Sequence, residues 1–433
     1  MKPKGGVRLK KNTIILISTL DTKGSEAAFL KSLIQGRGHR VILLDTNTGG
    51  EPSIPPDISA KEVAKDGGWN IEEVRKMKGT GKVASIMIDG AIKKVKTLLE
   101  KGELHGIISF GGASNTAIAT AIMKSLPFGI PKVMLSSMAA VPAYAGGYFG
   151  TKDIAIFHSV VDVVGSNPFV EDVLKRAAGA ICGMVEMGGG LASLSKTTHK
   201  KDLIALTEFK FSEECCSHIR HLLEEKGFEV IPFHAQGMGD RAMEDLIGEG
   251  LFQGVMDIVP AGVSEELLGG NRAAGPSRLE RAGEMGIPQI VTPCGFDMLS
   301  CGPLERGDRG DPLWISKDIK NRKLFIPDAF RVQARTYSQE LREIAREVAR
   351  KLNQSKGPVA MLIPLKGWSS LDKEGMPLYD PEADKAFVQE LKTHLHPKIP
   401  LIEIDLHLNT LEFAEEAVKQ FIKLYPVRKS STF

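Results

Sequence analysis

The sequence has few of the residues that mark a disulfide framework or a structural zinc site. It holds five cysteines among 433 residues, an odd number, and two of them, Cys215 and Cys216, are adjacent. No CxxC pair occurs, and the HExxH, GxSxG and calcium-loop patterns are absent as well. These absences exclude the usual signatures of a disulfide-stapled protein, a zinc protease, a serine hydrolase and a calcium-loop protein.

The chain also lacks a large excess of either charge and a long apolar run. Its 56 basic and 53 acidic residues give a formal net charge of +3, which supplies no argument for a nucleic-acid or membrane partner. The apolar segment Ile14 to Leu20, after a basic opening run, is too short for a signal peptide core or a membrane span. We therefore expect a cytoplasmic protein that binds neither nucleic acid nor membrane.

What the sequence does contain is enough apolar material for complete cores. Hydrophobic residues make up 42% and charged residues 25% of the chain, as in ordinary globular proteins. At roughly 150 residues per domain, this length suggests two or three domains, and we expect two large ones. Gly188, Gly189 and Gly190, followed by the polar stretch Ser193 to Lys201, predict a linker over 188–201 between domains at 1–190 and 200–433.

Apolar runs and amphipathic segments alternate through both halves of the chain. Thr13 to Thr19 and Arg40 to Leu44 read as strands, and the segment from Val83 to Lys101 reads as a helix. The alternation resumes after the linker and continues to a last helix at Leu411 to Leu424. This pattern predicts an α/β fold with two Rossmann-like domains, whose mainly parallel sheets are covered by helices.

A glycine turn in the first half is the best candidate for a ligand site. The stretch from His105 to Met123 reads as a buried strand, a turn at Gly111 and Gly112, and an apolar helix. Adjacent glycines allow close approach of the backbone to an anion, and Ser114 and Thr116 add hydroxyl donors beside a helix N-terminus. The turn therefore suits a phosphate cradle, but a bend that only packs strand against helix explains the same residues equally well.

Polar residues follow the other strands of this half. Asp21, Thr22 and Lys23 come after the first strand, Asp45 after the second and Ser136 after a later one. Ligands of open parallel sheets bind beyond the carboxyl ends of the strands, so these residues are candidate ligand contacts. The segment Ala143 to Thr151, rich in glycine and tyrosine, is a candidate binding loop, and Asp162 follows the last strand of this half.

The second half repeats this arrangement with charged residues. His234, Arg241, Glu265 and Lys366 stand at or just after expected strand ends. Such side chains can bind an anion, polarise a carbonyl group or transfer a proton. They are the candidate catalytic residues of an enzyme that would act on a small phosphate or carboxylate compound in a cleft between the domains.

Taken together, the motifs resemble an uncharacterised two-domain family that includes the N-terminal region of the tomato mosaic virus resistance protein. The resemblance covers nearly the whole chain from Ile14 to Phe421. Its residues are Asp21-Thr22-Lys23, Gly111-Gly112 with Thr116, Leu126 to Val133, Ser159 to Asp162, Phe233-His234-Ala235, Arg241 to Glu244, Gly269-Gly270, and Asp380 to Ala383.

The resemblance implies a nucleotide-binding protein, with ATP as the ligand, and a tendency to form homodimers. We add the hypothesis that magnesium binds with the nucleotide. The phosphates would lie at Gly111, Gly112, Ser114 and Thr116. Additional contacts would come from Thr22, Lys23 and Ser136, and Asp21 or Asp162 would hold the metal. A family without a settled reaction leaves three hypotheses open: a nucleotide-binding protein, the enzyme described above, and a scaffold whose loops bind another protein.

Overall fold

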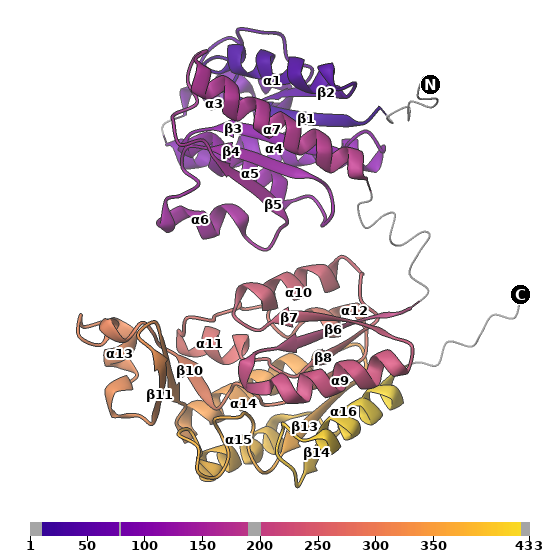
Figure 1. Ribbon diagram of the computed structural model, residues 1–433, viewed down its shortest axis with the longest axis vertical. Coiled ribbons are helices and arrows are strands. Elements are labelled where there is room, and N and C mark those ends of the chain that lie inside the picture. The colour runs from indigo at the N-terminus through magenta and orange to yellow at the C-terminus, as the bar shows by residue number, and fades with distance from the viewer. Residues whose placement is uncertain (1–10, 78, 189–200, 426–433) are drawn as a thin grey trace, which may run out of the picture. The chain divides into compact units, whose positions relative to one another are not determined.

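The chain divides into two compact units, Met1–His199 and Lys200–Phe433 (Figure 1). The computed structural model describes residues 11–77, 79–188 and 201–425. Most of the linker expected over 188–201 therefore lies outside the described residues.

The first unit is built on a five-stranded parallel sheet. Its strands lie in the order β2-β1-β3-β4-β5. They are β1 (Thr13–Ser18), β2 (Arg40–Asp45), β3 (Gly106–Gly111), β4 (Lys132–Ser136) and β5 (Ile154–His158). Because β1 and β3 are buried along their whole length, near-continuous apolar runs suit them better than an alternating pattern.

Helices cover both faces of this sheet. Alternate side chains of each strand point to opposite faces, so Ile15 and Ile17 pack with α2 to α5, whereas Ile14 and Leu16 pack with α1 and α7. The helices are α1 (Gly24–Gly36), α2 (Ala60–Asp66), α3 (Ile71–Lys76), α4 (Thr80–Glu100), α5 (Ala113–Lys124), α6 (Pro142–Phe149) and α7 (Pro168–Met187).

The glycine- and tyrosine-rich segment, expected to be a binding loop, is instead largely helix α6. Pro142 stands in the first turn of this helix, where proline is tolerated because the amide would have no helical partner. Tyr144 and Phe149 remain exposed on it. The prediction of a loop at Ala143 to Thr151 was therefore wrong, because a favourable helix start outweighed Gly146 and Gly147.

The second unit holds a six-stranded parallel sheet in the order β14-β13-β9-β8-β6-β7. Its strands are β6 (Leu203–Glu208), β7 (Glu229–His234), β8 (Gly254–Asp257), β9 (Gln289–Val291), β13 (Val359–Pro364) and β14 (Leu401–Ile404). Its helices are α9 (Glu213–Glu225), α10 (Met238–Gly248), α11 (Gly262–Leu268), α12 (Arg281–Met285), α13 (Pro312–Ser316), α14 (Ser338–Leu352), α15 (Pro381–His394) and α16 (Leu411–Leu424).

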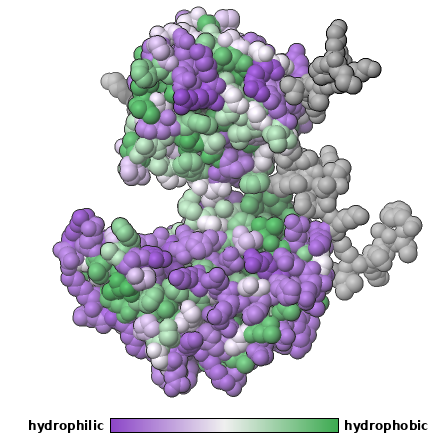
Figure 2. Space-filling model, viewed as in Figure 1, coloured by the Kyte–Doolittle hydropathy of each residue, from purple (hydrophilic) through white to green (hydrophobic). Residues whose placement is uncertain are grey.

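A small antiparallel sheet interrupts the alternation in this unit. It consists of β10 (Met298–Ser300), β12 (Arg331–Arg335) and β11 (Leu324–Asp328), in that order. On the face shown in Figure 2, hydrophilic residues cover most of the second unit, as expected when its apolar residues form the core.

The predicted α/β class, with two Rossmann-like units of mainly parallel sheets covered by helices, is confirmed. Within the described ranges, none of the helices combines the length and the apolar character needed to cross a bilayer.

Candidate functional site

The strand order of the first unit reverses between β1 and β3. The chain runs from β1 to β2 on one side and then crosses back to β3 on the other side. In doubly wound sheets, the crevice beyond the carboxyl ends of two such strands is where ligands bind. The loop after β1 and the glycine turn after β3, both predicted as ligand contacts, therefore meet at this point of reversal.

The loop after β1 contributes Asp21, Thr22 and Lys23. One carboxylate oxygen of Asp21, Oδ2, accepts a hydrogen bond from the amide of Gly50 at 3.3 Å, while the exposed hydroxyl of Thr22 donates to Oδ1 at 3.4 Å. The ammonium group of Lys23 donates to the carbonyl oxygen of Val163. Lys23 thus joins this loop to the loop after β5.

The glycine turn leads directly into helix α5. Gly111 has a φ of +148°, and an added Cβ there would lie 3.1 Å from atoms of Asn115, so the turn favours glycine. Gly112 is the N-cap residue of α5, without a capping side chain, and the first turn holds no acidic residue. The first amides of α5 are therefore available to an anion, with the exposed hydroxyl of Ser114 beside them.

Two of the predicted contacts have structural partners instead. Thr116 and Ser136 are fully buried, and their hydroxyl oxygens lie 2.7 Å apart. Thr116 also donates to the carbonyl oxygen of Gly112 at 2.8 Å, and Ser136 accepts from the amide of Met138 at 3.0 Å. These hydroxyls hold the glycine turn in place against β4, whereas the side chain of Ser114 is exposed.

Asn115 was not among the residues predicted from the sequence. Its side-chain amide donates to the hydroxyl of Ser109 at 3.2 Å and to the carbonyl oxygen of Phe110. Among the described residues, its Oδ1 atom has no hydrogen-bond partner. The sequence showed only an asparagine in the first turn of an apolar helix, and this gave no indication of a partner on β3.

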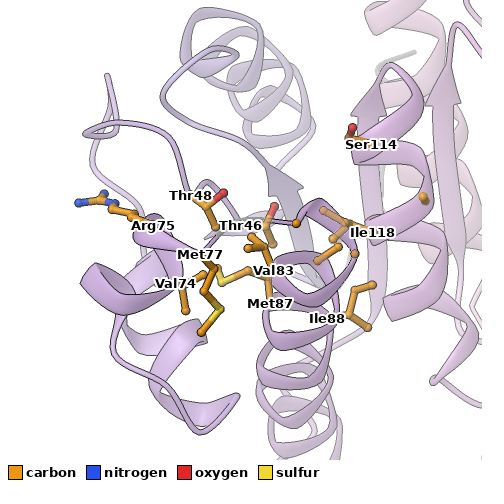
Figure 3. Close-up of a pocket in the computed structure, with 14 residues that line it drawn as sticks. Thr46, Thr48, Val74, Arg75, Met77, Val83, Met87, Ile88, Ser114 and Ile118 are labelled. Atoms are coloured by element: carbon orange, nitrogen blue, oxygen red, sulfur yellow. The ribbon is translucent and has the colours of Figure 1, made fainter.

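A pocket of about 500 Å³ opens beside α5 (Figure 3). Ser114, Ala117 and Ile118 of α5 form one wall, and Thr46 and Thr48, which follow β2, stand opposite. The rest of its described lining comes from α3, α4 and their connection, namely Val74, Arg75, Met77, Gly79, Gly81, Val83, Ala84, Met87 and Ile88. The exposed start of α5 is thus also the rim of a pocket.

The remaining acids of this unit have different surroundings. Asp45 is buried, which raises its pKa, and it accepts hydrogen bonds from the amides of Leu20 and Asn47, so it supports the loop after β1. Asp162 is exposed in the loop after β5. Over the described ranges, no group of three or more His, Cys, Asp or Glu side chains is arranged to hold a metal ion.

The four candidate catalytic residues all lie in the second unit, but the structure does not gather them. His234 ends β7 and Lys366 follows β13, four strands away, which is roughly 19 Å at the usual strand spacing. Lys366 pairs with Asp405 at 3.1 Å, and Arg241 is exposed on α10. Glu265 is fully buried and pairs with Arg272 at 2.8 Å, so its carboxylate has a structural role.

Fold and site together define a two-unit α/β protein with doubly wound sheets and a candidate ligand crevice in the first unit. The chain belongs to the uncharacterised protein family UPF0261. The model of the family's N-terminal domain matches residues 12–189, and that of its C-terminal domain matches residues 201–425.

Similar proteins occur in bacteria and plants. The chain is 38% identical over 412 residues to a UPF0261 protein of Clostridium tetani, covering 95% of this chain and 98% of that protein. It is 33% identical over 331 residues to the ToMV resistance protein Tm-1(GCR237) of Solanum lycopersicum, covering 76% of this chain but 42% of that protein.

Among solved structures, a UDP-N-acetylglucosamine 2-epimerase from Rickettsia bellii matches with a TM-score of 0.22 and 15% identity. The match covers 65% of this chain and 78% of that one. A TM-score this low carries no argument about the activity of the present chain.

Proposed function

We propose that the first unit binds a nucleotide, with its phosphates at the glycine turn and the first turn of α5. The observation that carries this proposal is the strand order β2-β1-β3-β4-β5, because its reversal brings the loop after β1 beside the turn after β3. ATP is the nucleotide that the resemblance to the family implies.

The groups around the turn suit a phosphate. The amides at the start of α5 have no capping side chain to accept from them, and the positive end of a helix dipole favours an anion there. The exposed hydroxyl of Ser114 adds a further donor, and that of Thr22 would do so on leaving Asp21. Lys23 would have to leave the Val163 carbonyl to reach a phosphate, so we assign it the role of a neighbouring positive charge.

Magnesium fits the same arrangement through Asp21. Magnesium in nucleotide sites is usually held by one or two carboxylates together with the phosphates, and it keeps several of its waters. A single carboxylate beside the turn is therefore sufficient, without a preformed cluster of ligands.

The test is a calorimetric titration of ATP, with and without magnesium, into wild type and the variant Gly112→Asp. Aspartate is a good N-cap residue, and the backbone at position 112 has a φ of −88° with room for a Cβ, so the variant should fold. Its carboxylate would occupy the amides of α5 and repel phosphate. We expect a loss of affinity of at least about tenfold, or 1.4 kcal/mol.

Gly112→Asn is the matched control, since asparagine has the same size and caps a helix equally well but carries no charge. It should bind ATP more tightly than Gly112→Asp does. Absence of ATP binding in the wild type, or equal affinity of wild type and Gly112→Asp, would refute the proposed site.

A further inference from the structure

The pocket beside α5 has a polar end and an apolar end. The hydroxyl-bearing side chains Thr46, Thr48 and Ser114 stand near the carboxyl edge of the sheet, as Figure 3 shows. The remaining wall is largely apolar, formed by Val74, Met77, Val83, Met87, Ile88 and Ile118. A ligand that fills this pocket therefore has a polar end at the strand ends and a body that tolerates apolar contact.

Arg75 adds one buried donor to the apolar wall, since its Nε atom has no hydrogen-bond partner among the described residues. Its guanidinium group is held by the carboxylates of Glu51 and Glu72, at 3.3 and 3.1 Å, and donates to the carbonyl oxygen of Gly50 at 3.0 Å. Figure 3 shows this group directed away from Ser114 and Ile118. The stem of Arg75 lines the pocket, while its charge lies outside.

Two helices begin beside the pocket. Gly79, the N-cap residue of α4, and Ser114, in the first turn of α5, both line it. Neither helix has a capping side chain or an acidic residue in its first turn. The dipole of α5 attracts an anion at its start, so the part of the pocket lined by Ser114 adjoins the phosphate position at the glycine turn.

On the basis of the nucleotide-binding function proposed above, we infer that this pocket binds the nucleoside part of the nucleotide. The pocket accepts different nucleobases. Strong discrimination between bases requires buried hydrogen-bonding groups that are left unpaired by the wrong base. Among the described side chains that line the pocket, the polar groups are hydroxyls, which both donate and accept, and the Nε donor of Arg75, for which every base offers an acceptor.

The apolar wall also adapts to shape. Met77 and Met87 have flexible, polarisable side chains that repack around ligands of different outline. Purines and pyrimidines are thus held by contact area and by the shared phosphates, with their polar edges toward the open side of the pocket.

The first experiment compares ATP, GTP, CTP and UTP, each with magnesium, by calorimetry on the full chain. We expect the four dissociation constants to fall within about tenfold of one another, because apolar contact alone discriminates weakly. A preference for one base of more than about a hundredfold would require a hydrogen-bonded base pocket and would overturn the inference. Failure of all four to bind would instead remove the proposed function itself.

The second experiment places the nucleoside. Ala117 is exposed and lines the pocket, so Ala117→Trp should fill it without disturbing the core. We expect all four nucleotides to bind at least about tenfold more weakly to this variant, whereas inorganic triphosphate, which needs only the turn, should bind as to wild type.

Ala28→Trp is the matched control, because Ala28 is exposed on α1, which packs against the opposite face of the sheet. It should bind all ligands as wild type does. Unchanged nucleotide affinity in Ala117→Trp, or an equal loss for inorganic triphosphate, would show that the nucleoside lies elsewhere.

Discussion

The hydroxyl oxygens of Thr116 and Ser136 lie 2.7 Å apart in the buried space between α5 and β4. Ser136 also accepts from the amide of Met138. This contact fixes the position of α5 relative to the sheet and so supports the turn at which we place the phosphates.

Ser136→Ala should therefore lower the free energy of unfolding by about 1–3 kcal/mol, because the buried Thr116 hydroxyl and the partly buried Met138 amide both lose a partner. Nucleotide affinity should change much less, since Ser136 does not face the ligand. Urea unfolding followed by circular dichroism measures the first effect, and calorimetry the second. Ser114→Ala, at an exposed position, should show the opposite pattern; a larger loss of affinity in Ser136→Ala than in Ser114→Ala would contradict this assignment.

Gly111→Ala should destabilise the first unit by about 1–3 kcal/mol, because alanine is strained at a positive φ and its Cβ would crowd Asn115. Gly112→Ala is the control. Its φ is −88° and the nearest atom to an added Cβ is the Ser137 hydroxyl oxygen at 3.9 Å, so little change is expected. Equal urea midpoints for the two variants would show that the turn has no special need for glycine at position 111.

Arg278 in the second unit pairs with three buried acids, Asp240, Glu244 and Asp257, at 3.3, 3.0 and 2.6 Å. Arg278→Met should cost about 3–5 kcal/mol at neutral pH, since it leaves these acids without their positive partner. Burial already raises the pKa of Asp240 and Glu244, so protonation should relieve part of the loss in mildly acidic buffer. Thermal unfolding at pH 7 and pH 5 tests this, and an equal loss at both pH values would contradict the explanation.

Asp297 is predicted to make stability depend on pH. Burial, and next the nearby Asp372, raise the pKa of Asp297 from 3.8 to about 6. Because the folded-state pKa is the higher one, the stabilising contribution is complete below pH 3.8 and is lost as the pH rises to about 6. The groups around it are Arg335, Asp372 and Ser369, and burial also raises the pKa of the neighbouring Asp384.

Asp297→Asn should flatten this dependence and stabilise the second unit at pH 7 by about 1–3 kcal/mol. The amide can still accept from Gly295 and can donate to Ser369, which preserves both hydrogen bonds of the carboxylate. Urea unfolding between pH 4 and pH 8 provides the measurement. An unchanged pH profile in the variant would show that another group is responsible.

Much of the fold could be predicted because its strands are long and apolar. Runs such as Ile14 to Ile17 and Ile107 to Phe110 are buried on both faces of a parallel sheet, and in the sequence they are apolar except for Ser109. The strand β10, of three residues, is too short to show a period, and the antiparallel sheet that contains it could not be predicted.

The site was harder to predict, because it depends on pairs of residues far apart in sequence. Thr116 and Ser136 looked like ligand contacts because one stands beside a helix N-terminus and the other at a strand end, but the fold pairs their hydroxyls with each other. Glu265 looked catalytic until its burial against Arg272 was visible. The pocket wall from α3 and α4 has no local signature, because apolar residues on one helix face predict a core as readily as a pocket.

All five cysteines of the chain are buried. Burial raises the pKa of Cys182 to about 11 and that of Cys301 to about 12, and thiols react with alkylating dyes as thiolates. A cysteine placed at the exposed Thr22 would therefore be labelled selectively, without removal of the native thiols. One substitution is therefore enough to attach a single fluorophore at the edge of the first unit's sheet where the nucleotide is proposed to bind.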